Sequence, residues 1–283
     1  MMEVTEPQIC FAKEIFMAFF DIKFYSMTLQ TDMDIQVIIP TPNGRPSQVP
    51  YYDKNKRYQV LYLLHGASGG NTQWTRFTAI ERYAQQHQLA VVCPHASNSF
   101  YVDTHPGSRY MTYITKELPT FIQSMFPVST RREDTFIAGN SMGGFGAFRL
   151  ALCCPEQYGC AVSLSGALDV INMAKVMPTD PTGVIRFADV FGPDGLTPGN
   201  DNDLTALAQR KVQEGCNLPK FYQCCGTEDF LYRINVSMHT QLEEAGLDLT
   251  YAESPGIHDW AYWDSQLPAI MEWLPLAKDL VDA

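Results

Sequence analysis

The chain of 283 residues has no apolar run close to the ~20 residues that a membrane-spanning helix needs, because its apolar segments are short and interrupted. It also has no basic run with interleaved aromatic residues, and its 31 acidic against 20 basic residues give a formal net charge of -11. Such a charge repels phosphate backbones and anionic lipid headgroups. The composition therefore argues against nucleic acid and membranes as partners.

Metal-binding and disulfide patterns are also missing. The eight cysteines include no C-x-x-C pair and no Cys/His cluster at zinc spacing, and two adjacent pairs lie within apolar segments, Cys153–Cys154 and Cys224–Cys225. We expect free thiols that pack as small hydrophobic groups, and no metal or organic cofactor. The first residues lack the basic and apolar regions of a secretory signal peptide, which predicts a cytoplasmic location.

Short apolar strands alternate with helical segments along most of the chain. The predicted strands are Asp34–Ile39, Tyr58–Leu64, Leu89–Cys93, Thr135–Ala138, Cys160–Leu164, Lys220–Cys225 and Leu247–Glu253. This order predicts an α/β fold with a mostly parallel central sheet and helices on both faces. In the helix expected over Tyr110–Ser124, Pro119 must cause a kink or a restart.

The alternation stops between about residues 169 and 215, where only a helix around Leu204–Val212 is predicted. This segment precedes the strand Lys220–Cys225. We interpret it as a cap-like insertion within one domain over residues 17–283, and not as a second domain.

The strongest chemical signal is Gly139-Asn140-Ser141-Met142-Gly143, which has the form G-x-S-x-G. It follows a predicted strand and opens a helix rich in small residues, the context of a nucleophile on a strained strand-to-helix turn. Ser68 lies in a second match, Gly66-Ala67-Ser68-Gly69-Gly70. That loop comes early in the chain and begins after His65, where such enzymes place an oxyanion-hole donor. We therefore favour Ser141 as the nucleophile.

A serine nucleophile needs a base, and the base needs an orienting carboxylate. Of six histidines, His258 lies just after a late strand, at the sheet edge where sites collect. His87 and His239 fall within helices, His65 suits a structural role, and His95 and His105 lie in a long loop that could shape the pocket. Asp229 follows another strand at the same edge, with Glu228 as the alternative. The order Ser141, Asp229, His258 is the order that this fold uses.

The segments LLHGASGG, GNSMGGFGA, CGTEDF and GIHDW, in this order, resemble the esterase D family of α/β-hydrolases, and within it bacterial tributyrin esterases. The resemblance covers about residues 17–283, so residues 1–16 look like an extension. It implies a triad of Ser141, Asp229 and His258, an oxyanion hole formed by the N–H groups of Met142 and Ala67, and hydrolysis of small short-chain acyl esters. It also implies a homo-oligomer.

Several alternatives stay open within this resemblance: an S-formylglutathione hydrolase-like thioesterase, a feruloyl or acetyl-sugar esterase, an acyltransferase, and an inactive binding module. The formylglutathione enzymes typically carry a cysteine-containing loop where this chain has HGASGG. Candidates to line the substrate pocket are the insertion 169–215 and the aromatic residues Trp74, Phe100, Tyr101 and Trp260.

Overall fold

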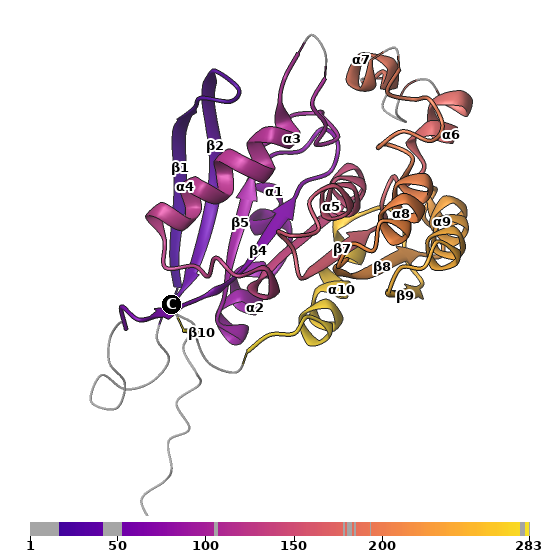
Figure 1. Cartoon of the computed structure of the whole chain (residues 1–283). Coiled ribbons are helices and arrows are strands. Elements are labelled where there is room, and N and C mark those ends of the chain that lie inside the picture. The colour runs from indigo at the N-terminus through magenta and orange to yellow at the C-terminus, as the bar shows by residue number, and fades with distance from the viewer. Residues whose placement is uncertain are drawn as a thin grey trace, which may run out of the picture.

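An eight-stranded sheet organises the structure, with strand order β1-β2-β5-β4-β6-β7-β8-β9 (Figure 1). The computed structural model describes residues 17–41, 53–104, 107–177, 179, 183, 185–192, 194–277 and 281–282. Strands β5, β4, β6, β7, β8 and β9 run parallel, whereas β2 pairs antiparallel with both β1 and β5. The predicted mostly parallel sheet is therefore confirmed.

Each predicted strand is present, with ends shifted by a few residues at most. The observed bounds are β2 (Thr31–Pro40), β4 (Gln59–Leu64), β5 (Leu89–Pro94), β6 (Thr135–Asn140), β7 (Cys160–Leu164), β8 (Lys220–Gly226) and β9 (Leu249–Ser254). The edge strand β1 (Met17–Ser26) was not predicted, because adjacent exposed residues such as Phe19 and Phe20 break the alternation of a half-buried strand. Strands β3 (Lys56–Arg57) and β10 (Val281–Asp282) form a separate pair.

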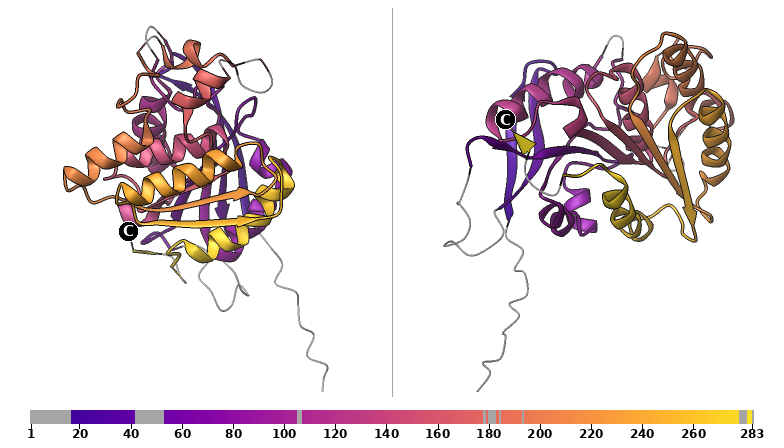
Figure 2. Two further views of the ribbon diagram at one scale, coloured as in Figure 1. Left: turned by 90° about the vertical axis from the view of Figure 1, so that its right-hand side faces the viewer. Right: turned by 60° about the horizontal axis from the view of Figure 1, so that its bottom comes forward.

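Helices cover both faces of the sheet. One face carries α1 (Gln73–Phe77), α2 (Ile80–His87) and α10 (Trp260–Trp273), and the other is covered mainly by α4 (Leu118–Met125), α5 (Met142–Cys153), α8 (Leu204–Gln213) and α9 (Tyr232–Glu244) (Figure 2). Side chains of β4 alternate between these two cores, with Tyr62 on the α5 side and Leu61 on the α10 side. In the described part of the chain, no helix is long and apolar enough to span a membrane.

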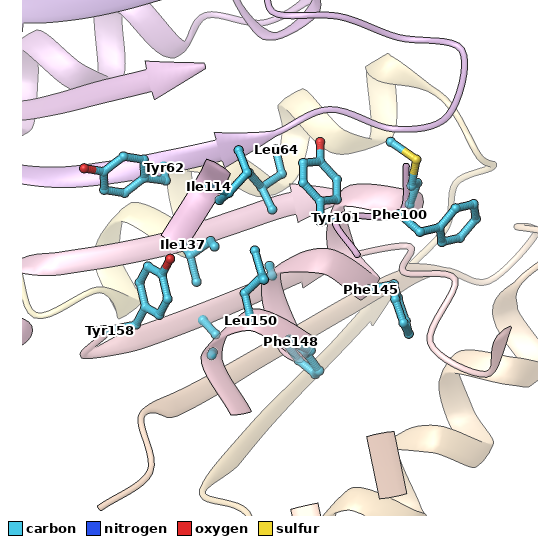
Figure 3. Close-up of a cluster of buried hydrophobic side chains, with 14 of the residues drawn as sticks. Tyr62, Leu64, Phe100, Tyr101, Ile114, Ile137, Phe145, Phe148, Leu150 and Tyr158 are labelled. Carbon is cyan, nitrogen blue, oxygen red and sulfur yellow. The ribbon is translucent and has the colours of Figure 1, made fainter. Parts of the chain in front are cut away.

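The core on the α5 side is rich in aromatic residues (Figure 3). Phe100 and Tyr101 lie at one end of this cluster, and Tyr62 and Tyr158 lie at the other. The described cysteines are all free thiols, as predicted, and most are buried.

The helix expected over Tyr110–Ser124 is divided into three parts. A short α3 (Tyr110–Thr112) leads into a π-helical turn at Tyr113–Glu117, and α4 follows. Pro119 lies in the first turn of α4, directly after the π-helical turn. The Leu118 N–H reaches back to the Tyr113 carbonyl, so the expected interruption takes the form of a π-helical turn.

The insertion contains more structure than the sequence indicated. Besides α8, it forms α6 (Val170–Val176) and α7 (Phe187–Phe191), which stand apart from the helices that cover the sheet (Figure 1). The prediction of loop structure here was wrong because helices this short show little periodicity. The side chain of Asp169 caps α6 by accepting the Asn172 N–H.

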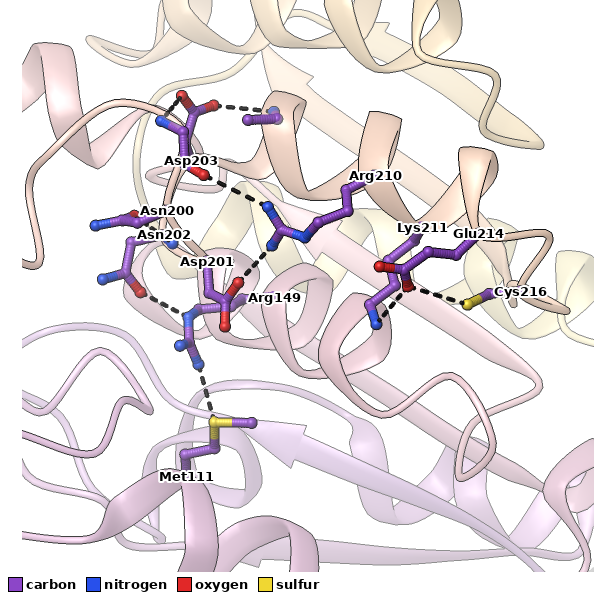
Figure 4. A network of polar contacts seen from close by, with 12 residues as sticks. Met111, Arg149, Asn200, Asp201, Asn202, Asp203, Arg210, Lys211, Glu214 and Cys216 are labelled. Carbon is purple, nitrogen blue, oxygen red and sulfur yellow. Dashed lines mark hydrogen bonds and ion pairs between the residues drawn. The ribbon is translucent and has the colours of Figure 1, made fainter.

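A polar network joins the end of this insertion to α5 (Figure 4). Arg149 is 7% exposed, and its Nε donates to Oδ1 of Asn202 over 2.7 Å. Asn202 in turn donates from Nδ2 to the Gly195 carbonyl over 2.8 Å. The buried guanidinium therefore fixes the chain that returns from the insertion to the sheet.

We predict that Arg149→Met lowers the free energy of unfolding by about 2 kcal/mol, because a hydrogen bond to a charged group is lost and the Asn202 oxygen is left without its donor. Urea denaturation measures the change. Arg210→Gln is the matched control, since it removes an exposed ion pair to Asp201 that we expect to contribute less than about 1 kcal/mol. An equal decrease in the free energy of unfolding in the two variants would contradict the stabilising role of the Arg149 hydrogen bond to Asn202.

Candidate active site

Ser141 lies on a strained turn between β6 and α5. Its φ of 53° and ψ of -116° fall where residues with a side chain are uncommon. Hydrogen bonds to β7 and to the segment after it hold the turn: the Ser141 N–H donates to the Leu164 carbonyl over 2.9 Å, and the Ser141 carbonyl accepts from the Ala167 N–H over 3.1 Å. The serine therefore sits at the carboxyl edge of the sheet and at the N-terminus of a twelve-residue helix, where the helix dipole favours negative charge.

The glycines on either side permit this turn. A Cβ on Gly143 would stand 2.5 Å from the Leu64 carbonyl oxygen, and one on Gly139 would stand 2.5 Å from the Gly143 backbone. Both distances are too short for any side chain. The G-x-S-x-G pattern thus reflects the close approach of α5 to the ends of β4 and β6.

Asp229 and His258 meet at the ends of β8 and β9. The Asp229 side chain is 0% exposed, and its two carboxylate oxygens lie 2.8 and 3.1 Å from His258 Nδ1. The Leu231 N–H also donates to this carboxylate over 2.8 Å. The ring of His258 packs between Phe230 and Trp263, with centroid distances of 4.6 and 5.0 Å. These contacts leave Nε2 as the nitrogen that can exchange a proton with a substrate.

Glu228, the alternative carboxylate, has a different contact. Its Oε2 accepts the Gly256 N–H over 2.6 Å, while its own N–H donates to the Gly256 carbonyl over 3.0 Å. The Gly256 N–H also lowers the pKa of the Glu228 carboxyl. Glu228 therefore joins the two loops that carry Asp229 and His258, and it does not bond to the imidazole.

His65 orients the loop that begins at Gly66. Its Nδ1 lies 2.7 Å from the Gly66 carbonyl oxygen, and its Nε2 lies 2.9 Å from the Ala96 nitrogen. A carbonyl can only accept and a backbone N–H can only donate, so the ring is neutral with its proton on Nδ1. Burial lowers the pKa of His65 to about 4, which is consistent with a neutral ring.

The orientation of this peptide bears on the predicted oxyanion hole. Because the peptide bond is trans, the Ala67 N–H points away from the anchored Gly66 carbonyl. The Met142 N–H opens α5, so it has no acceptor in its own helix. Among the described residues, neither N–H donates a backbone hydrogen bond outside regular structure. Both residues line the same cavity as Ser141.

That cavity has a volume of about 220 Å³, and both Ser141 and His258 line it. Most of its wall is apolar, formed by Ala67, Phe100, Met142, Ala167, Met173, Phe187, Phe230, Leu231, Trp260 and Trp263. The polar lining residues besides Ser141 and His258 are Ser68, Gln73 and Asn140. An apolar cavity with a few convergent polar groups is the usual form of a small-molecule site.

Of the four aromatic residues predicted to line the pocket, Phe100 and Trp260 do so, whereas Trp74 and Tyr101 are fully buried outside the lining. Trp74 donates from Nε1 to the Leu64 carbonyl over 3.0 Å. Tyr101 donates its hydroxyl to the His65 carbonyl over 2.8 Å. Both support the strand end and loop that carry Ala67, so they act behind the cavity wall.

Other residues that line the cavity were not predicted from the sequence, although some of them are close in sequence to residues that were. Met173 and Phe187 come from the insertion that was predicted to contribute, but no local pattern singled them out. Phe230 follows Asp229 directly, and Trp263 lies one helical turn from Trp260. The position of each beside a predicted site residue could therefore have indicated that it lines the cavity.

The other described histidines do not contact Asp229 or Ser141. His239 pairs with Glu243 across one turn of α9 at 3.3 Å, and His87 ends α2. His95 stacks on His65 with ring centroids 5.5 Å apart. His105 lies outside the described residues.

Comparisons with known proteins agree with this fold. The Esterase family model, described as "Putative esterase", matches residues 26–274. An acetyl esterase of Caldicellulosiruptor saccharolyticus is 33% identical over 269 residues, which span 93% of this chain and 100% of that protein.

Two solved structures from Staphylococcus aureus are each 31% identical to this chain. A substrate-bound, fluorophosphonate-binding serine hydrolase F superposes with a TM-score of 0.82 and covers 91% of this chain and 98% of its own. An S-formylglutathione hydrolase superposes with a TM-score of 0.78 and covers 92% and 99%.

The fold and these relatives define an α/β-hydrolase that acts as a carboxylic ester hydrolase on small-molecule esters. The chain belongs to the Esterase family.

The buried His65 gives a testable pH dependence. Its pKa is about 4 in the folded protein and about 6.5 when unfolded, so the unfolded state takes up the proton first as pH falls. Stability is therefore lost from about pH 6.5 downward, and this group alone should remove about 2 kcal/mol between pH 7 and pH 5. Urea denaturation of the wild type and of His65→Gln should show a shallower pH slope in the variant. Equal pH slopes of the free energy of unfolding in the wild type and in His65→Gln would contradict the lowered pKa of His65.

Proposed function

We propose that this protein is a serine carboxylesterase that hydrolyses short-chain acyl esters, of the acetyl and tributyrin type, through Ser141, His258 and Asp229. The observation that carries the proposal is the contact of the buried Asp229 carboxylate with His258 Nδ1, because His258 lines the same cavity as the strained Ser141. A buried carboxylate on Nδ1 fixes the tautomer whose Nε2 can accept a proton, and it stabilises the imidazolium that results.

The reaction proceeds in two steps. Ser141 Oγ attacks the ester carbonyl carbon while His258 Nε2 takes its proton, and the N–H groups of Met142 and Ala67 meet the developing oxyanion. His258 then returns the proton to the leaving alcohol, which yields an acyl-enzyme. A water molecule, deprotonated by His258, attacks the acyl carbon and releases the acid and the free serine.

The wall of the cavity supports short acyl groups. Phe100 lies against Phe187 and Phe191 of α7, with ring centroids 5.5 and 5.3 Å apart, so aromatic rings close one side of a volume of about 220 Å³. The leaving oxygen must reach His258, which places the alcohol beside Phe230 and Trp260. We therefore assign the acyl group to the Phe100 side, where the insertion 169–215 contributes Phe187 as part of a cap.

A thioesterase acting on S-formylglutathione is the second candidate, because one relative at 31% identity carries that name. Glutathione bears two carboxylates, and the described lining of the cavity includes neither lysine nor arginine. The HGASGG loop also has no cysteine. Both features favour uncharged oxygen esters.

Three further expectations from the sequence stay predictions: acyltransferase activity as an alternative, a homo-oligomer and a cytoplasmic location.

We predict that Ser141→Ala abolishes hydrolysis of p-nitrophenyl acetate, butyrate and octanoate, whereas the matched control Ser68→Ala keeps it. Asp229→Asn should lower kcat by about 1000-fold or more, because His258 loses the partner that fixes its tautomer. In the wild type, kcat/KM should be highest for the two shorter esters. Hydrolysis that survives in Ser141→Ala and disappears in Ser68→Ala would contradict the proposal.

A further inference from the structure

Asn235 is a buried amide near the start of α9 that bonds to two other parts of the chain. It is 0% exposed, and its Nδ2 donates to the Gly166 carbonyl and to the Leu231 carbonyl, each over 3.0 Å. Its Oδ1 accepts from Nε2 of Gln223 on β8 over 3.1 Å. An amide nitrogen carries two hydrogen atoms, so both side-chain donors of Asn235 are used. The amide therefore links the loop before α9 to the segment that contains Gly166.

The segment around Gly166 follows β7 and holds the turn of Ser141. The next residue, Ala167, donates its N–H to the Ser141 carbonyl over 3.1 Å. The preceding residue, Ser165, has a φ of 47°, which is uncommon for a residue with a side chain. Because Gly166 lies between these two residues, a shift of its carbonyl moves Ala167 and with it the backbone of Ser141.

Leu231 connects the same amide to Asp229. The Leu231 carbonyl accepts the backbone N–H of Asn235 over 2.9 Å as well as its Nδ2. The Leu231 N–H donates to the Asp229 carboxylate over 2.8 Å. One peptide unit on each side of Leu231 thus separates Asn235 from the carboxylate that contacts His258.

We propose that Asn235 is a positioning residue of the esterase reaction, whose amide holds the loop of Asp229 in a fixed place relative to the turn of Ser141. This inference rests on the proposed function, because the relative position matters only if both residues serve one reaction. Asn235 lies outside the described lining of the cavity, so it acts through Leu231 and Gly166 and not by contact with a substrate. A misplacement of reacting groups by about 1 Å can lower a rate about 100-fold.

The first test measures kcat and KM for p-nitrophenyl acetate in the wild type and in Asn235→Leu. Leucine keeps the branched shape of the side chain and removes its polar atoms. We expect kcat to fall about 10-fold or more, because Asp229 and His258 shift relative to Ser141. KM should change by less than about 2-fold, because Asn235 does not contact the substrate.

A double-mutant cycle separates positioning from a general loss of stability. In the Asp229→Asn background, we expect Asn235→Leu to lower kcat by less than about 3-fold, because a carboxylate that is absent needs no positioning. A purely structural role of Asn235 would lower kcat by the same factor in both backgrounds.

The matched control is Gln59→Met, which also replaces a buried amide by an apolar side chain of similar shape. Gln59 Nε2 donates to Oδ1 of Asp134 over 3.0 Å, and its Oε1 accepts the Ala277 N–H over 2.8 Å. Gln59 opens β4, at the opposite end of the strand from Leu64 and the site. Thermal denaturation should show both variants to be less stable than the wild type, whereas Gln59→Met should keep the wild-type kcat.

The proposal is overturned by an unchanged kcat in Asn235→Leu, by an equal fall of kcat in Gln59→Met, or by an undiminished effect in the Asp229→Asn background. Asn235→Ala is the second variant if leucine prevents folding. If neither variant folds, Asn235 serves folding alone and the proposal is wrong. A wild type inactive on p-nitrophenyl acetate, or an Asp229→Asn variant as active as the wild type, would instead show that the proposed function fails.

Discussion

The close approach of α5 to the end of β4 is the constraint on which the site depends. Gly143 rests against the Leu64 and His65 carbonyls with no room for a side chain, and this contact forces Ser141 into its strained turn. The same contact sets the serine beside the loop that starts at Gly66. Backbone packing therefore positions the proposed nucleophile and the proposed oxyanion donors, and it is more rigid than any arrangement of flexible side chains.

A second backbone arrangement holds Asp229 and His258, the proposed carboxylate and base. The loops after β8 and β9 are joined by the reciprocal bonds of Glu228 with Gly256, and Asp229 then meets His258 within this frame. Parallel strands bring their carboxyl ends to one edge, so residues far apart in sequence converge. Burial supports both arrangements, since the neutral His65 fixes the first loop and aromatic rings pack around the imidazole of His258.

The fold and the meeting of Asp229 with His258 could be predicted because their signals are local. Each functional residue follows an apolar strand, and G-x-S-x-G reports a backbone contact that only glycine permits. Trp74 and Tyr101 were misplaced because sequence does not show whether an aromatic side chain faces a cavity or lies behind its wall. The short helices α6 and α7 lack periodicity, and in the edge strand β1 the adjacent exposed Phe19 and Phe20 obscure the alternation.

The most direct test of the central claim is to locate the covalent adduct that an alkyl fluorophosphonate forms with the wild-type protein. The nucleophilic oxygen attacks phosphorus and expels fluoride, so the modified peptide identifies the serine. Peptide mass spectrometry should find the adduct on the peptide that contains Ser141. An adduct on the peptide that contains Ser68, with Ser141 unmodified, would contradict the account of the site given above.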